Sequence, residues 1–176
     1  MDNDKITAIF SKDVIMAPEG NLSKQLYDKS RFGEPKGKKY YYSYVEALYL
    51  FEEEKMELFD GRNKKLDFDS FVNRARRADP RFWTKYAVYQ EMRKRGYVVK
   101  TALKFGADFR VYARGIKPGE DHAKWILYSV HEREVLTWYE FSAKNRVANS
   151  TKKKLLLGIV DDEGDVTFYE IRWTRP

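Results

Sequence analysis

The dipeptide Asp79-Pro80 constrains the fold of this chain more than any other local feature. A carboxylate followed by proline is typical of a helix N-terminus. The carboxylate caps the helix, and proline suits the first helical position because the N–H there has no partner within the helix and proline has no N–H. Short strands and helices are mixed before this point, whereas one helix and then mostly strands follow it. We therefore expect two domains, spanning residues 1–79 and 80–176.

The first domain is expected to be a small α/β domain. Its clearest signal is a capping box, in which Ser43 is followed three residues later by Glu46 at the start of an apolar helix. Asn21 or Ser23 is expected to cap another helix, which ends at Tyr27. Strand patterns occur at residues 6–17, 38–42 and 56–59, and a further helix is expected from Asp67 or Asp69 to Ala78.

The second domain is expected to begin with an amphipathic helix and to continue as a sheet. Phe82, Tyr86, Tyr89 and Met92 recur at intervals of three and four residues, and Gly96 is the stop signal. Strand patterns follow at residues 98–103, 108–113, 124–130, 155–160 and 166–173, with a helix at 137–148. The fold class is therefore α+β, and the second domain is expected to have a central mixed or antiparallel sheet flanked by helices.

The composition favours an anionic partner. Lys and Arg number 34 against 27 Asp and Glu, which gives a formal charge of +7 and a pI near 9.3. Binding to a polyanion releases its counterions, so a basic protein gains affinity for such a partner. Nucleic acid is the first candidate and an acidic membrane surface is the second.

The absence of cysteine excludes disulfides, thiol nucleophiles and thiolate metal sites. Residues 1–5 lack the cationic start and apolar run of a signal peptide. No apolar stretch approaches the roughly 20 residues that span a bilayer. We expect a cytoplasmic protein that enters no membrane and carries no cofactor or metal.

Three side chains supply the chemistry that metal-free RNA cleavage requires: the phenol of Tyr112, the imidazole of His122 and the ammonium of Lys153. Alternation along the strand at 108–113 places Tyr112 on its polar face, together with Arg110. A tyrosine taken alone is more often structural, and the chain has 13 of them. The assignment therefore depends on the surrounding pattern.

The other two candidates also have plainer explanations. His122 follows an acidic turn and enters an apolar strand, and the ordinary imidazole pKa of about 6.5 suits proton transfer near neutral pH; the alternative is a surface histidine. Lys153 lies in residues 144–154, which hold five basic residues and no acidic ones and would attract phosphate. The alternative is a solvated basic face. His131, which lies among charged neighbours, is expected to be solvated.

Longer motifs surround these residues. The most specific are Lys85-Tyr86-x-Val88-Tyr89, Arg93-x-Arg95-Gly96-Tyr97-x-Val99-Lys100-Thr101, Lys104-Phe105-Gly106-Ala107-Asp108-Phe109-Arg110-x-Tyr112 and Arg146-Val147-Ala148-x-Ser150. Together with Ser43-x-Val45-Glu46-Ala47-Leu48-Tyr49-Leu50, they resemble archaeal tRNA-splicing endonucleases over essentially the whole chain. The resemblance implies that residues 80–176 form a nuclease-like catalytic domain and residues 1–79 a structural one.

The resemblance also implies a reaction, which is excision of introns from precursor tRNA at bulge-helix-bulge motifs without a metal. The products would carry 2′,3′-cyclic phosphate and 5′-hydroxyl ends. The catalytic residues of the family correspond to Tyr112 as base, His122 as acid and Lys153 as charge stabiliser. A phenol with its ordinary pKa near 10 is a poor base at pH 7 unless a neighbouring cation lowers that pKa, so orienting the 2′-hydroxyl is the alternative role of Tyr112. Lys152 and Lys154 are adjacent, so the register of the lysine is open by one residue.

Further positions take roles only through the resemblance. Arg146 matches an arginine that holds a base of the bulge, and Arg172 or Trp173 is the candidate for the second such residue. The acidic turn is implied to insert into a neighbouring subunit, through Asp161, Asp162, Glu163 and Asp165. The implied assembly is a homotetramer, with a heterotetramer containing a second kind of subunit as the alternative.

Two other functions compete with this interpretation. In the first alternative, the chain is a structural or RNA-positioning subunit of a heteromeric endonuclease. Degraded catalytic residues would favour that alternative, and none of the three is degraded here. The second is a magnesium-dependent nuclease that uses Asp161, Asp165 and Glu170. These carboxylates lack a following lysine in the expected register, so the second alternative is weaker.

Overall fold

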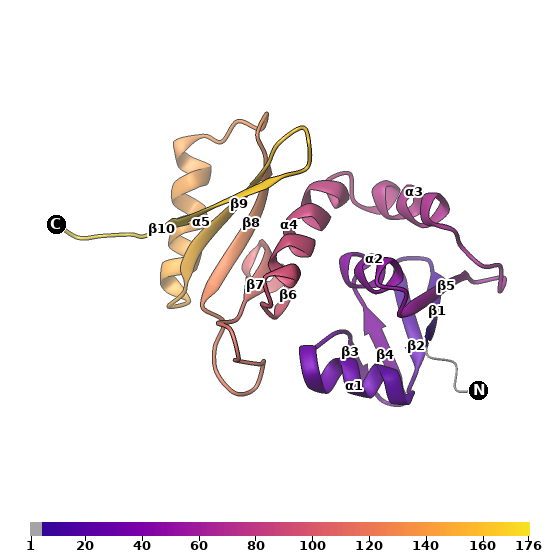
Figure 1. The fold of residues 1–176 in the computed structure, drawn as a ribbon. Helices are drawn as coiled ribbons and strands as arrows, with labels where there is room; N and C mark the ends of the chain where they lie inside the picture. Colours follow the sequence, from indigo (N-terminus) through magenta and orange to yellow (C-terminus); the bar gives the residue numbers. More distant parts are fainter. Residues whose placement is uncertain (1–4) are drawn as a thin grey trace. The chain divides into compact units, whose positions relative to one another are not determined.

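The computed structural model describes residues 5–176. The chain divides into two compact parts, which we call the N-terminal unit (Met1–Trp83) and the C-terminal unit (Thr84–Pro176) (Figure 1). Met1 to Asp4, and with them the expectation about the start of the chain, lie outside the described residues. The structural and catalytic roles assigned to the two domains stay predictions.

The N-terminal unit is a five-stranded sheet with helices, as an α/β pattern predicts. Its elements are β1 (Ile6–Ser11), β2 (Val14–Pro18), α1 (Asn21–Ser30), β3 (Glu34–Lys36), β4 (Lys39–Tyr42), α2 (Tyr44–Glu52), β5 (Met56–Asp60) and α3 (Phe68–Ala78). The strand order is β3-β4-β2-β1-β5, with β1 and β5 parallel and the other pairs antiparallel. The sequence pattern does not predict the short β3 strand.

Helix starts in this unit follow the local signals with one exception. Ser43 and Glu46 form the predicted capping box at α2, and Asp67, rather than Asp69, caps α3 by accepting from the Ser70 N–H at 2.8 Å. The prediction for α1 was wrong, because its N-cap is Gly20 and no side chain caps it. Ser23 lies inside α1 and is buried.

The C-terminal unit is a second five-stranded sheet with two long helices. Its elements are α4 (Phe82–Lys94), β6 (Val99–Ala102), the 3-10 turn η1 (Leu103–Phe105), β7 (Ala107–Val111), β8 (Trp125–His131), α5 (Trp138–Ser150), β9 (Lys154–Val160) and β10 (Val166–Ile171). The first two residues of α4 belong to the N-terminal unit. The strand order is β10-β9-β8-β7-β6. Only β8 and β9 are parallel, because α5 connects them as a crossover, so the sheet is mixed. The predicted α+β class is confirmed.

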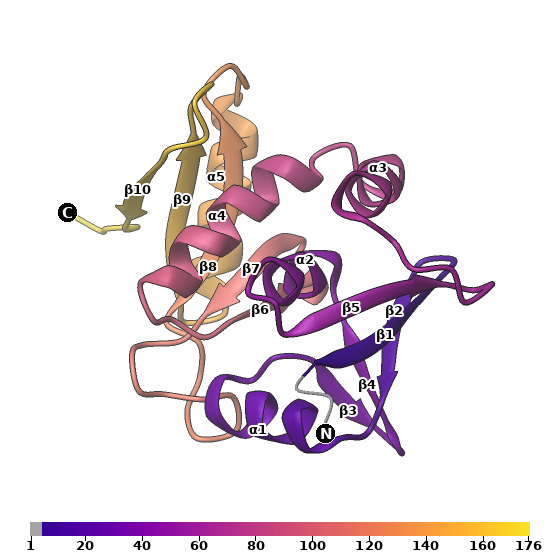
Figure 2. The ribbon, with the colours of Figure 1, turned by 45° about the vertical axis from the view of Figure 1, so that its right-hand side comes forward.

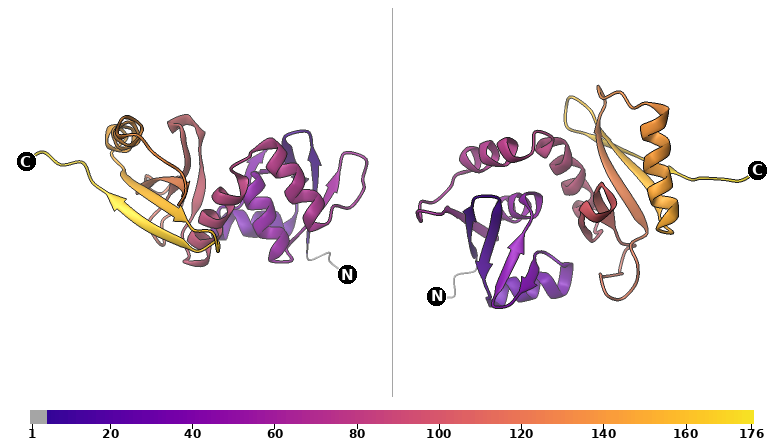
Figure 3. Two further views of the ribbon diagram at one scale, coloured as in Figure 1. Left: turned by 90° about the horizontal axis from the view of Figure 1, so that it is seen from above. Right: turned by 180° about the vertical axis from the view of Figure 1, so that it is seen from behind.

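The two helices cover opposite faces of this sheet (Figure 3). On one face Ala148 of α5 packs with Ile126, Leu155 and other buried residues. On the other face α4 lies so close to β9 that a Cβ atom added at Gly158 would meet Cγ1 of Val88 at 2.9 Å. Because both faces of the sheet are buried, β9 is apolar on both sides, which explains the continuous apolar run that follows the three lysines.

Among residues 5–176, no helix is both long and apolar enough to cross a membrane.

Candidate active site

One open cavity of the C-terminal unit is lined by all three predicted catalytic residues. Tyr112, His122 and Lys153 border it, although 10 and 31 residues separate successive members in the sequence. The cavity has a volume of about 410 Å³. Folding therefore brings a phenol, an imidazole and an ammonium to one concave surface, which is the kind of place where ligands bind.

Tyr112 lies directly after β7, because the strand ends at Val111 instead of the predicted Ala113. Its N–H donates to the carbonyl of Val98 at 3.0 Å, which holds the backbone against the chain that precedes β6. The residue is only 5% exposed. Tyr112 is nevertheless one of the residues that line the cavity.

His122 lies in the loop between β7 and β8, which extends away from the sheet (Figure 2). It does not enter a strand as predicted, since β8 begins only at Trp125. Two bonds between side chains and backbone form within the loop. The Glu120 carboxylate accepts from the Lys117 N–H at 3.0 Å, and the Asp121 carboxylate accepts from the His122 N–H at 2.6 Å. His122 itself is exposed, so the imidazole is accessible to a substrate.

The structure distinguishes among the three consecutive lysines. Lys153 lines the cavity and donates from Nζ to the carbonyl of Thr151 at 3.0 Å. Lys154 begins β9 and forms an ion pair with Glu170 at 3.3 Å. Lys152 is exposed and has a left-handed backbone with φ 56°. The register expected from the sequence, with Lys153 at the site, is the one that this geometry supports.

The remaining cavity residues were not assigned a role from the sequence. They are Phe105, Arg110, Gly119, Glu120, Asp121 and Ala123. Of these six residues, only Arg110 is indicated by the sequence, because alternation along the predicted strand places it on the same face as Tyr112. Phe105 gave no such signal, because its place beneath Lys153 depends on the η1 turn.

The residues predicted to bind RNA lie elsewhere in the C-terminal unit. Arg146 is exposed on α5, and Arg172 and Trp173 follow β10. Arg172 donates from Nε to Glu170 at 2.9 Å, and Trp173 is 49% exposed. None of the three borders the cavity.

Glu170 connects three donors at the outer part of the sheet. It accepts from Nε1 of Trp125 at 2.8 Å and from Arg172, and it pairs with Lys154. These contacts, with the indole bond first, lower the pKa of the Glu170 carboxyl to about 2. Glu170 is therefore ionised throughout the neutral range and serves as the structural partner of Lys154.

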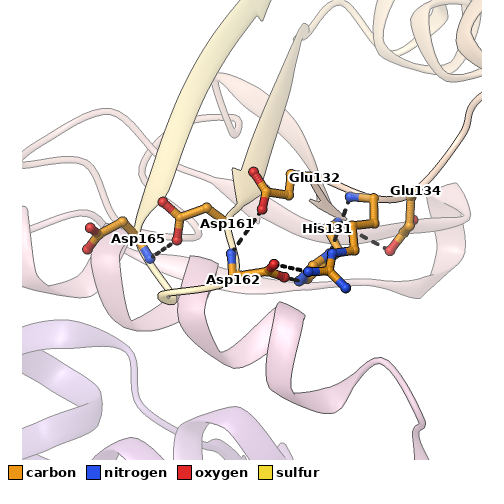
Figure 4. A network of polar contacts seen from close by, with 7 residues as sticks. His131, Glu132, Glu134, Asp161, Asp162 and Asp165 are labelled. Atoms are coloured by element: carbon orange, nitrogen blue, oxygen red, sulfur yellow. Dashed lines mark hydrogen bonds and ion pairs between the residues drawn. The ribbon is translucent and has the colours of Figure 1, made fainter.

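The acidic turn between β9 and β10 is partly engaged within its own chain (Figure 4). Asp161 accepts from the N–H of Asp165 at 2.8 Å, which closes the turn. Asp162 is bonded to Arg133 and lies 3.5 Å from Nε2 of His131. His131, expected to be solvated, is half-buried beside this carboxylate.

The carboxylates of the magnesium alternative do not come together. Asp161 and Asp165 flank the turn, whereas Glu170 pairs in register with Leu156, four residues along the strand from the Val160–Val166 pair. At about 3.3 Å per strand residue, that separation exceeds what one ion can bridge. Among residues 5–176, no group of three or more His or acidic side chains is placed to hold a metal.

Known families account for nearly the whole chain. The tRNA intron endonuclease catalytic C-terminal domain matches residues 82–168, and the N-terminal domain of the same family matches residues 6–72. The chain belongs to the tRNA intron endonuclease family. The resemblance inferred from the sequence motifs is thereby confirmed, and so is the prediction that the protein is an endonuclease of this class.

Individual relatives agree over most of their length. A tRNA-splicing endonuclease of Nanoarchaeum equitans is 45% identical over 138 residues, covering 75% of this chain and 88% of the relative. One of Thermococcus kodakarensis is 39% identical over 165 residues, covering 94% and 96%. One of Pyrococcus furiosus is 36% identical, covering 94% of both. The similarity therefore includes both units of the chain.

Proposed function

We propose that the protein excises introns from precursor tRNA by cutting at bulge-helix-bulge motifs, without a metal, to give 2′,3′-cyclic phosphate and 5′-hydroxyl ends. The observation that carries the proposal is the single cavity lined by Tyr112, His122 and Lys153. These side chains cover the three requirements of the reaction, namely a proton acceptor, a proton donor and a cation.

In the proposed reaction, the 2′-hydroxyl of the nucleotide before the cut attacks its own phosphorus. Tyr112 removes the proton of that hydroxyl as the new P–O bond forms. His122 donates a proton to the departing 5′-oxygen as the old P–O bond breaks, which leaves a neutral 5′-hydroxyl. Lys153 stabilises the additional negative charge of the phosphorane between these events.

The geometry suits these assignments in different ways. Tyr112 follows the end of β7 and is buried as a whole residue. His122 is exposed on a loop, where it is accessible to RNA. The ammonium of Lys153 is anchored to the Thr151 carbonyl and lies near the Phe105 ring. A fixed cation stabilises a transition state without having to reorganise.

RNA binding and assembly complete the proposal. Arg146 and either Arg172 or Trp173 would hold unstacked bulge bases, because guanidinium planes and aromatic rings both stack on bases. Four copies of the chain would assemble, with the acidic turn of one copy contacting its neighbour. Two active cavities would then face the two cuts of one intron.

The proposal is tested by separating binding from chemistry. Purified His122→Ala is expected to bind a bulge-helix-bulge RNA like the unaltered protein and to lose cleavage by about 100-fold or more. His131→Ala is the matched control, because it removes the other histidine of the chain from outside the cavity. Equal activity of the two variants would contradict the assignment of His122.

A further inference from the structure

We propose that Arg110 binds the scissile phosphate as a second cation beside Lys153. The inference rests on the proposed function, and it adds a residue that touches the reacting group. Arg110 lies on β7, and Tyr112 follows the end of that strand two positions later. Both side chains line the cavity, together with Lys153.

Among residues 5–176, the side chain of Arg110 makes none of the hydrogen bonds that hold a structural arginine in place. Its Nε atom is buried without a partner among the described residues. Arg93 of the same unit shows the contrast, because its Nε donates to the Tyr89 hydroxyl at 3.0 Å and its guanidinium also donates to the carbonyl of Val99 at 3.3 Å. A buried donor without an acceptor costs free energy, which an arriving anion would offset.

The two carboxylates of the cavity bond to the backbone of their own loop. Glu120 accepts from the backbone of Lys117, and Asp121 accepts from the backbone of His122, so both serve the loop that carries the histidine. Among residues 5–176, Arg110 forms no ion pair with either carboxylate. A phosphate is the natural partner for it.

The chemistry of guanidinium fits this task better than a second ammonium would. Its planar fork donates two parallel hydrogen bonds to the non-bridging oxygens of a phosphate, and it stays protonated at every pH where RNA is stable. Lys153 supplies a point charge from the end of the α5–β9 connection, while Arg110 would supply directed donors from β7. The two together would fix the phosphorus for in-line attack.

The test compares Arg110→Ala and Arg110→Lys with the control Lys104→Ala in single-turnover cleavage of a bulge-helix-bulge RNA. Lys104 is exposed, adjoins Phe105 in sequence and does not line the cavity, so its loss removes the same charge without the proposed contact. We expect a rate at saturating protein about 100-fold lower for Arg110→Ala, with RNA affinity nearly unchanged. Arg110→Lys should recover only part of the rate.

Chemical rescue distinguishes contact with the phosphate from a structural effect. Guanidinium chloride at concentrations far below denaturation should accelerate Arg110→Ala, while sodium chloride at equal ionic strength should not. A rate for Arg110→Ala equal to that of Lys104→Ala, with His122→Ala inactive, would overturn the role of Arg110 and leave the proposed function intact. A slow variant without rescue and with a lowered melting temperature would overturn it too. Inactivity of the unaltered protein would instead contradict the proposed function itself.

Discussion

The ammonium of Lys153 lies 5.5 Å from the centroid of the Phe105 ring. This distance is within the range of a cation–π contact. Lys153 is therefore held from two sides, by the ring and by the Thr151 carbonyl. The two neighbouring lysines differ from Lys153, since Lys154 pairs with Glu170 and Lys152 is exposed.

The three lysines should therefore differ sharply in their effect on cleavage. Lys153→Ala is expected to lower the single-turnover rate by about 100-fold, because it removes the cation that stabilises the phosphorane. Lys152→Asn should cleave nearly normally, since asparagine tolerates the left-handed backbone at this position. Rates measured side by side on one RNA check this. An equal loss in both variants would indicate general attraction of RNA by the basic stretch.

Gly158 should be intolerant of a side chain, because α4 packs directly on it. A Cβ atom there would lie 2.9 Å from Cγ1 of Val88 and 3.2 Å from Cε1 of Phe168. Gly158→Ala is expected to lower the free energy of unfolding by about 1–3 kcal/mol. Denaturant titration measures the free energy of unfolding. In the double variant, Val88→Ala should reduce the loss of stability caused by Gly158→Ala. Additive losses in the double variant would show that the close approach is not the cause.

Glu170 should make stability depend on pH. Its folded pKa of about 2 is below the ordinary value of 4.5, so the carboxylate contributes stability above pH 4.5 that is lost as the pH falls toward 2. Glu170→Gln is expected to cost about 1–2 kcal/mol at pH 7 and progressively less at pH 4 and pH 3. Melting temperatures across this range check it. A difference that stays constant with pH would exclude ionisation as the cause.

The acidic turn should contain two kinds of carboxylate. The carboxylates of Asp161 and Asp162 bond to groups of their own chain, whereas those of Glu163 and Asp165 make no such bond among the described residues. If the turn contacts a neighbouring subunit, Glu163→Gln with Asp165→Asn should produce smaller assemblies without unfolding the protein. Sedimentation velocity at several concentrations measures the size. An unchanged assembly would place the subunit contact elsewhere.

Local chemistry made much of the fold predictable. The Ser43–Glu46 capping box, the Asp67 cap and the apolar face from Phe82 to Met92 depend on residues within a few positions of one another, and all are found as expected. The α1 start was missed because Gly20 caps through its backbone alone, which leaves no side-chain signal. The short β3 strand was missed because Glu34-Pro35-Lys36 has no apolar alternation.

Long-range arrangement was harder to predict. The parallel pairing of β8 with β9 depends on the path of α5, and no local pattern reports it. Tyr112, His122 and Lys153 were found because their residue types stand in family motifs, not because spacing brought them together. Phe105 and the free Nε of Arg110 became visible only when separate segments met at one cavity.

The most direct measurement is to incubate the purified protein with an end-labelled bulge-helix-bulge RNA in EDTA and to identify the product ends. We predict paired cuts whose upstream products end in 2′,3′-cyclic phosphate and whose downstream products begin with a 5′-hydroxyl. Tight binding without cleavage, cleavage only after magnesium is restored, or products with 5′-phosphate ends would each contradict the proposed reaction.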